Sequence, residues 1–178
     1  MKKGFTMIEL IFVIVILGIL ASVAIPRLAG TREDAEIATA IANLRTLVND
    51  ANVYYTVKGT FDNVKWNEIT NVSLKDENGV AITSSLKAIG DQTYLAVNRK
   101  NYLQIGMRDS ATSTFIAFRP VEVNKNDSAC SKVLESDLVK SILESTIPSS
   151  GKQDGTENCT GVKNGGMSCI NITTSSIY

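Results

Sequence analysis

The sequence predicts an α+β protein in which one long N-terminal helix packs against a small antiparallel sheet. Three observations predict this class. An apolar run from Phe5 to Ile25 continues directly into a segment whose apolar residues recur with helical spacing. Short runs rich in β-branched and aromatic residues follow from Thr93 onward. A later amphipathic segment and a glycine-containing turn near the C-terminus add an extra helix and a hairpin.

The composition limits the possible functions. The 178 residues suffice for one folded domain and an anchor, and 44% hydrophobic with 20% charged residues is ordinary for a folded protein. The 18 basic and 18 acidic residues cancel, so bulk charge gives no reason to expect nucleic-acid binding. The chain contains no histidine, which excludes Ser-His-Asp and Cys-His catalysis and most zinc sites. We therefore expect neither enzymatic activity nor a cofactor.

The N-terminal apolar run has the length of a membrane-spanning helix. It covers 21 positions and is interrupted only by Thr6, Glu9 and Ser22. A helix of about 20 apolar residues crosses a hydrocarbon core of roughly 30 Å. Lys2 and Lys3 precede the run, and this distribution of charge predicts a cytoplasmic N-terminus.

Two ordinary interpretations of this run leave one residue unexplained. A secretory signal peptide fits the small residues Ser22 and Ala24 on either side of Val23, and a plain membrane anchor fits the length. Neither explains Glu9, because a carboxylate inside an apolar span costs on the order of 2.5–3.5 kcal/mol on insertion scales. Such a residue indicates a functional role and requires a partner.

The segment Gly4-Phe5-Thr6-Met7-Ile8-Glu9-Leu10 closely resembles the processing site of type IV prepilins and type II secretion pseudopilins. The resemblance implies that a prepilin peptidase cleaves after Gly4 and methylates the new N-terminal residue, Phe5. It also implies that Glu9 of one subunit pairs with the Phe5 amine of its neighbour. Such pairing offsets the cost of two charges in an apolar bundle and fixes the axial register. Pro26 falls where that family has a helix-kinking proline.

This resemblance implies a type IV pilin-like organisation of the whole chain. Residues 1–4 are the leader, 5–25 the transmembrane and filament-core helix, and 26–178 the globular head, which includes the second half of the long helix. The implied protein is a structural subunit that assembles into a helical filament with other pilins or pseudopilins on an inner-membrane platform. Before assembly it would cross the bacterial inner membrane once, with its head in the periplasm, and the filament would lie in the periplasm or at the cell surface.

Several functional alternatives remain open within and beyond this resemblance. The filament is a type II secretion pseudopilus, which we slightly favour, or a type IV pilus. A minor tip subunit that recognises DNA or a surface is the alternative role. A secreted enzyme behind an ordinary signal peptide is the interpretation that belongs to a different class.

The segment from Arg27 to Tyr55 continues the helix. Apolar residues recur at alternating spacings of four and three, which predicts one buried stripe. Together with the apolar run, the segment predicts a helix of about 50 residues that ends at Gly59. The stripe consists of Ile37, Ile41, Leu44, Val48, Ala51 and Tyr55.

The segment 60–92 is predicted to be rich in loops. Asn78-Gly79 lies between two short apolar runs and predicts a small hairpin. Asp76, Glu77 and Asn78 offer oxygen ligands for calcium, but the spacing is not that of an EF-hand. We therefore favour a solvated turn over a calcium site.

Three strands are predicted at Tyr94–Val97, Tyr102–Ile105 and Thr114–Phe118, with a turn around Lys100-Asn101 between the first two. Arg99, Lys100 and Arg108 form a modest basic cluster in this region, which we interpret as solvated charges rather than a DNA-binding site. After these strands, Ser128 is predicted to cap a helix over residues 129–146.

The three cysteines lie in the last third of the chain. A predicted hairpin from Cys159 to Tyr178, turning at 163–166, places Cys159 and Cys169 opposite each other, which suits a disulfide. The resemblance to pilins also implies such a bond, since many pilins have a disulfide in their C-terminal region. A bond from Cys130 to either of the other two is the rival pairing.

Overall fold

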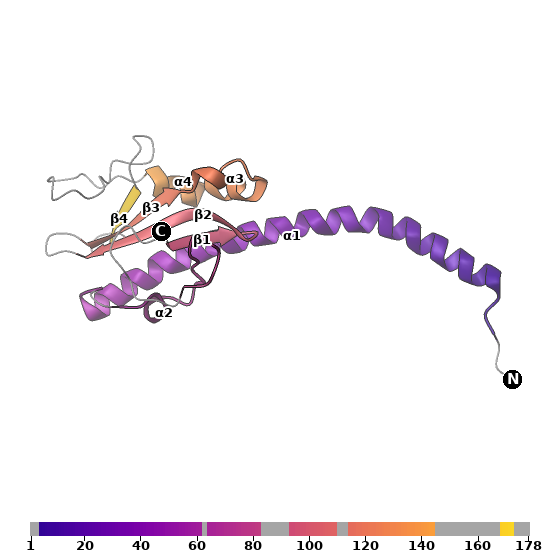
Figure 1. The fold of residues 1–178 in the computed structure, drawn as a ribbon, viewed down its shortest axis with the longest axis horizontal. Coiled ribbons are helices and arrows are strands. Elements are labelled where there is room, and N and C mark those ends of the chain that lie inside the picture. Colours follow the sequence, from indigo (N-terminus) through magenta and orange to yellow (C-terminus); the bar gives the residue numbers. More distant parts are fainter. Residues whose placement is uncertain (1–3, 62–63, 83–92, 110–113, 145–167, 173–178) are drawn as a thin grey trace. The chain divides into compact units, whose positions relative to one another are not determined.

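A computed structural model describes residues 4–61, 64–82, 93–109, 114–144 and 168–172. The chain divides into two compact units, Met1–Ala35 and Glu36–Tyr178. We call the second the head unit. Helix α1, Met7–Lys58, contributes its first part to the N-terminal unit and its second part to the head unit (Figure 1). The predicted α+β class is confirmed.

Helix α1 ends where the sequence predicts. Gly59 follows the last helical residue with a φ of +74°, a conformation that favours glycine because it has no Cβ. Its backbone N–H donates to the carbonyl of Tyr55 at 2.7 Å, which closes the last turn. One uninterrupted helix of 52 residues is thus confirmed.

A single antiparallel sheet forms the centre of the head unit. Its strands lie in the order β1-β2-β3-β4, and each is antiparallel to its neighbour. The three predicted strands are confirmed, and a fourth, close to the C-terminus, adds to the edge formed by β3. The bounds are β1 Thr93–Val97, β2 Lys100–Asp109, β3 Thr114–Pro120 and β4 Ser168–Asn171.

The turn between β1 and β2 lies two residues earlier than the sequence predicts. Asn98 and Arg99 have φ values of 49° and 64°, the left-handed conformation of a two-residue hairpin loop that matches the twist of the strands. Lys100 and Asn101, predicted as the turn, instead pair with Val97 and Ala96. The prediction was wrong because arginine is rarely found in this left-handed conformation.

A β-bulge interrupts the pairing of β1 with β2. Leu95 lies opposite Leu103, whereas Ala96 lies opposite Asn101. Tyr102 is therefore the extra residue of β2, without a partner on β1. Bulges of this kind change the direction of a side chain relative to the regular strand.

Two short helices replace the single helix predicted over 129–146. Helix α3 is Ser128–Glu135 and helix α4 is Asp137–Glu144. Ser136 separates them with an extended ψ of 145°, and its hydroxyl donates to the carbonyl of Val133 at 2.7 Å. The serine side chain thus competes with the helical backbone, which the apolar periodicity does not reveal.

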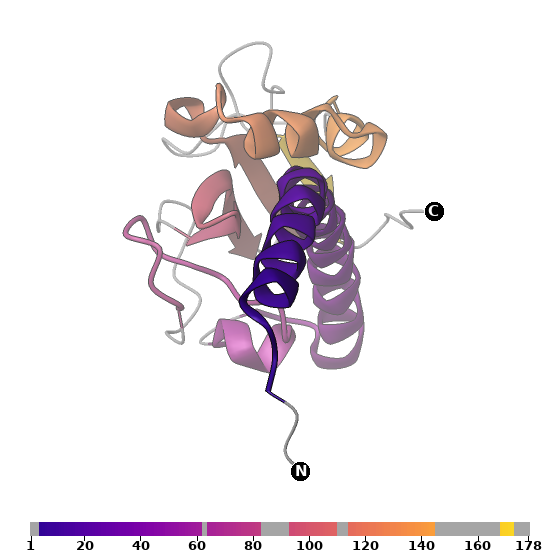
Figure 2. The same cartoon turned by 90° about the vertical axis from the view of Figure 1, so that its right-hand side faces the viewer.

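The sheet lies between two helical layers of the head unit. Figures 1 and 2 both show the second half of α1 on one side and the pair α3–α4 on the other. This arrangement explains why every residue of β3 except Arg119 is buried, on both faces of the strand. The most deeply buried residues of α1 are Leu44, Leu47, Val48 and Ala51.

The described part of the segment after α1 follows the loop-rich prediction. It contains the short helix α2, Trp66–Ile69, whose Trp66 and Ile69 enter the core. A small hairpin follows, in which Lys75 bridges to Ala81 and Gly79 has a φ of +80°. The predicted hairpin at Asn78-Gly79 is confirmed, and Lys75 also pairs with Tyr94 at the edge of the sheet.

The C-terminal predictions are tested only in part. Cys130 is a free cysteine, fully buried in α3. Cys169 lies in β4 opposite Ala117. Cys159 and most of the predicted C-terminal hairpin lie outside the described residues, so the Cys159–Cys169 disulfide stays a prediction.

Candidate functional site

The candidate site is the segment that leads into α1. Gly4, Phe5 and Thr6 precede the first helical residue, Met7, and the side chain of Phe5 is 85% exposed. A Cβ placed on Gly4 would meet no heavy atom within 4 Å beyond its chain neighbours. The bond after Gly4 is therefore sterically open.

Thr6 and Glu9 form a capping box at the start of α1. The Glu9 carboxylate accepts two hydrogen bonds at Oε2, from the Thr6 backbone N–H at 2.8 Å and from the Thr6 hydroxyl at 2.6 Å. In return, the Glu9 backbone N–H donates to the Thr6 hydroxyl at 3.4 Å. This reciprocal arrangement satisfies donors that the first turn of a helix otherwise leaves unpaired.

The capping box gives Glu9 a partner within its own chain, which the sequence analysis missed. The signal was present, since Thr followed three residues later by Glu before an apolar run is the signature of this motif. Both bonds from Thr6 end on Oε2. Among the residues that the structure describes, no donor reaches Oε1, so this oxygen can accept a further bond.

The first part of α1 exposes apolar side chains on all sides. Every large apolar residue from Phe5 to Leu28 is exposed, including Ile8, Phe12 and Leu20. By length and composition α1 is able to cross a membrane. Since apolar surface of this extent is unfavourable in water, this part of the helix requires a lipid or protein environment.

Pro26 lies inside α1, and the helix continues through it. Proline has no N–H, so the carbonyl four residues earlier, at Ser22, lacks its usual partner in the helical ladder. The Ser22 hydroxyl donates to the carbonyl of Ile19 at 2.7 Å. The helix therefore lacks one backbone hydrogen bond in the turn between Ser22 and Pro26.

The calcium candidate of the sequence analysis is a turn closed by its own side chain. Asp76 Oδ1 accepts the backbone N–H groups of Asn78 at 2.9 Å and Val80 at 2.8 Å. One carboxylate oxygen is thus occupied by the turn. Within the described ranges of the chain, no group of three or more acidic or cysteine residues is arranged to hold a metal ion.

The three basic residues noted in the sequence do not form one cluster. Arg99 and Lys100 lie at the start of β2, whereas Arg108 is near the other end of this ten-residue strand. At about 3.3 Å per residue the two ends are roughly 25–30 Å apart. The predicted cluster was therefore wrong, because the strand is longer than its apolar run suggested.

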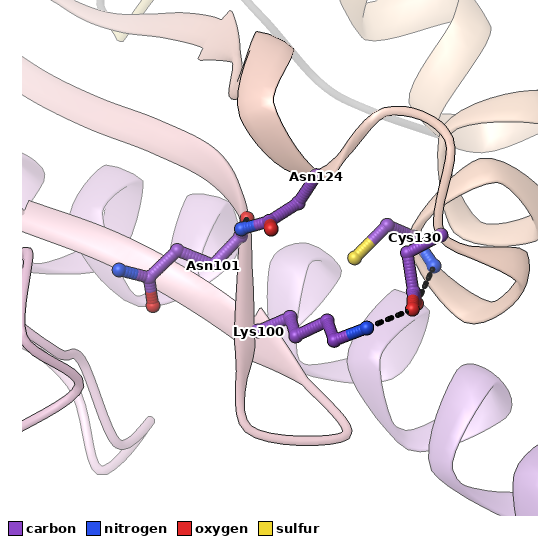
Figure 3. A network of polar contacts seen from close by, with 5 residues as sticks. Lys100, Asn101, Asn124 and Cys130 are labelled. Atoms are coloured by element: carbon purple, nitrogen blue, oxygen red, sulfur yellow. Dashed lines mark hydrogen bonds and ion pairs between the residues drawn. The ribbon is translucent and has the colours of Figure 1, made fainter.

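Figure 3 shows that Lys100 takes part in a local polar network instead. Its ammonium group pairs with the carboxylate of Asp127, which also accepts the backbone N–H of Cys130 at 3.3 Å and caps α3. The hydrogen bond from Lys100 holds the pKa of Asp127 below its usual value. Nearby, the side-chain amide of Asn124 donates to the backbone carbonyl of Asn101 at 2.9 Å. The network joins β2 to the start of α3.

The thiol of Cys130 is unsuited to nucleophilic chemistry. Burial, followed by the negative charge of Asp127, raises its pKa to about 11. A thiol with this pKa is almost entirely protonated at neutral pH, and the thiolate is the reactive form. The network in Figure 3 is therefore structural.

The N-terminal segment matches a known family model. Residues 1–25 match the prokaryotic N-terminal methylation motif. The match contains Gly4, Phe5 and Glu9, the residues identified from the sequence, and ends one residue before Pro26.

The relatives of this chain match it over less than a third of its length. The type II secretion system core proteins G of Aeromonas hydrophila and Vibrio cholerae are each 43% identical to it over 53 residues, and that of Escherichia coli K12 is 40% identical over 53 residues. These matches cover 30% of this chain and 36–37% of the relatives, so the chain spans about a third of the length of the curated relatives it matches. No solved structure matches this chain significantly.

Proposed function

Because its N-terminal segment is of the type found in pilins and pseudopilins, we propose that this chain is a filament subunit. In this proposal a prepilin peptidase cleaves after Gly4 and methylates Phe5. The mature subunit then polymerises through the first part of α1. The single observation that carries the proposal is the match of residues 1–25 to the N-terminal methylation motif. The role is structural rather than enzymatic.

The geometry of the N-terminal segment supports processing. The bond after Gly4 is sterically open, and Phe5 lies outside the helix. The capping box uses the N–H of Thr6, not that of Phe5, so cleavage after Gly4 leaves it intact. The new Phe5 amine therefore arises beside a helix start that is already formed.

The capping box also supports charge pairing between subunits. Thr6 orients the carboxylate of Glu9 and leaves Oε1 available. The Phe5 amine of a neighbouring subunit is the donor we propose for this oxygen. Because an unpaired charge is expensive in an apolar bundle, each contact would favour one axial register of the neighbouring helices.

We propose that the filament is a type II secretion pseudopilus. The relatives named core protein G belong to type II secretion systems, and their match of 53 residues is longer than the 21-residue apolar run. In this proposal the unassembled subunit lies in the inner membrane with its head unit in the periplasm. Its partners are the prepilin peptidase, other pseudopilins and the inner-membrane assembly platform.

The test is mass spectrometry of the N-terminal peptide from native membranes. We expect a mature chain that begins at N-methylated Phe5. Replacing Gly4→Val should leave the precursor unprocessed, whereas the matched control Gly18→Val, within the same apolar helix, should be processed normally. Normal processing of the Gly4 variant, or a wild-type chain that begins near Ile25 or at Met1, contradicts the proposal.

A further inference from the structure

The turn of the small hairpin that follows α2 contains the dipeptide Asn78-Gly79. Asn78 is exposed, and its side chain makes no hydrogen bond to any residue that the structure describes. Glycine has no side chain, so nothing on Gly79 hinders the approach of its backbone nitrogen to the residue before it. These are the conditions under which an asparagine side chain reacts with the peptide nitrogen that follows it.

Asp76 holds the backbone of this turn in place. Its carbonyl accepts the N–H of Gly79 at 3.1 Å. One oxygen of its carboxylate, Oδ1, accepts the N–H groups of Asn78 at 2.9 Å and of Val80 at 2.8 Å. The nitrogen of Gly79 is therefore occupied as a hydrogen-bond donor as long as the turn is closed.

The turn lies at the exposed end of the hairpin. Leu74, at the base of the hairpin, is buried in the core of the head unit. Glu77, Asn78 and Val80, at its tip, are exposed. Backbone hydrogen bonds that are exposed and have little apolar packing open locally, at a lower cost than global unfolding. The turn can therefore open while the rest of the head unit stays folded.

We propose that Asn78 is a site of spontaneous deamidation and that Asp76 controls the rate of this reaction. When the turn opens, the Gly79 nitrogen forms a bond to the side-chain carbonyl carbon of Asn78 and loses its proton to water, and ammonia leaves. Water then opens the cyclic imide, which yields aspartate or isoaspartate at position 78. The inference is independent of the proposed function.

The reaction would weaken the contact between the hairpin and the sheet. It places a new negative charge in the same turn as Asp76 and Glu77, and charges of one sign repel each other at short distances. The hairpin is attached by Lys75, which exchanges backbone hydrogen bonds with Tyr94 at 2.9 and 2.8 Å. The side-chain amide of Asn101 also donates to the carbonyl of Asp76 at 3.0 Å. We expect these contacts to open more often in the modified chain.

The test is incubation of the full chain in detergent micelles at neutral pH, followed by peptide mapping with mass spectrometry. We expect Asn78 to convert in the folded wild type, but more slowly than in the same chain in denaturant. The dipeptide Asn164-Gly165 is the reference in denaturant, where both asparagines should convert at similar rates.

Two substitutions of Asp76 test its control of the rate. Asp76→Ala removes the carboxylate that holds Asn78 and Val80, so Asn78 of the folded variant should convert about tenfold faster, which is the effect of losing one or two hydrogen bonds. Asp76→Asn retains an oxygen acceptor at the same place, so Asn78 should convert at a rate close to that of the wild type.

Val139→Ala is the control for global stability. Val139 is fully buried in α4, and truncation of a buried side chain destabilises the whole head unit. Because the turn opens locally, this variant should convert Asn78 at the wild-type rate. The inference is overturned if Asn78 of the folded wild type does not convert while the denatured chain does. An unchanged rate in Asp76→Ala, or an equally high rate in Val139→Ala, also overturns it.

Discussion

The carboxylate of Glu9 has two donors from Thr6, and both reach the same oxygen. This detail separates the capping role of Glu9 from the charge-pairing role that we propose for it. As a helix cap, Glu9 needs only a hydrogen-bond acceptor at the third helical position, which glutamine also provides. As a partner for an amine of another subunit, it needs its negative charge. A neutral isostere therefore distinguishes the two roles.

We predict that Glu9→Gln inserts and is processed normally but assembles poorly. The capping box remains, whereas the charge that we propose as the partner of the neighbouring Phe5 amine is lost, so we expect at least about tenfold less protein in sheared filaments. Immunoblots of sheared and membrane fractions measure this ratio. Thr6→Val is the complementary variant, because it removes the capping hydroxyl and retains the charge. Wild-type amounts of Glu9→Gln filament would show that the charge is not needed.

At the residue scale, the sequence predicted which residues form the candidate site better than it predicted the hydrogen bonds that these residues make. Gly4, Phe5 and Glu9 were recognisable because their order and spacing match a processing motif. The capping role of Thr6 was missed, although a threonine three residues before a glutamate is the signature of a capping box. The hydrogen bond from the Tyr102 hydroxyl to the carbonyl of Ala40 was not predictable, because it depends on a bulge between strands and joins residues 62 positions apart in the chain.

Among the secondary-structure elements, α3 depends most clearly on one side chain. Asp127 caps its first turn and pairs with Lys100 of β2. We predict that Asp127→Ala lowers the free energy of unfolding by about 1 kcal/mol, since the cap is lost. Asp127→Asn should lose less, because asparagine caps a helix equally well. Thermal unfolding of the full chain in detergent, followed by circular dichroism, measures both.

The pH dependence of this contribution has a definite sign. The hydrogen bond from Lys100 lowers the pKa of Asp127 in the folded protein. The ionised carboxylate of Asp127 therefore contributes fully to the free energy of unfolding above about pH 4, the ordinary pKa of an aspartate. This contribution is lost as the pH falls through the lower pKa that Asp127 has in the folded protein. We expect the melting temperatures of wild type and Asp127→Asn to differ at pH 7. They should converge once the pH is below the pKa of Asp127 in the folded protein. A difference that persists in strong acid would contradict this role of the carboxylate.

At the element scale, the spacing of apolar residues predicted the long helix and three strands. It did not predict the break between α3 and α4 or the exact turn between β1 and β2. The apolar residues of α1 and of β1 to β3 lie on the buried faces of these elements. Their regular spacing therefore allows the elements to be predicted from the sequence. The break at Ser136 and the left-handed Arg99 depend on local backbone conformation, which burial patterns do not encode. The pairing of β4 with β3 joins segments far apart in the chain and has no local signal.

For the whole molecule, the phenotype of a deletion strain distinguishes a type II secretion pseudopilus from a type IV pilus. We predict that deleting the gene abolishes secretion of folded exoproteins and leaves surface pili unchanged, as expected for a pseudopilus subunit. Secretion assays and electron microscopy of the same strain measure both outcomes. Restoration by the wild-type gene, but not by Gly4→Val, is the control. Loss of pili with normal secretion would assign the chain to a type IV pilus instead.

The strand order of the head unit has a consequence for the timing of folding. Strands β1, β2 and β3 are consecutive in the chain, so they can pair as soon as all three have been synthesised. Among the described strands, the one that pairs with the outer edge of β3 is β4, which begins 48 residues after Pro120. A chain that emerges N-terminus first therefore carries an unpaired edge at β3 until β4 follows. During that interval the edge is open to pairing with other chains, and a chaperone that covers it would act at this stage.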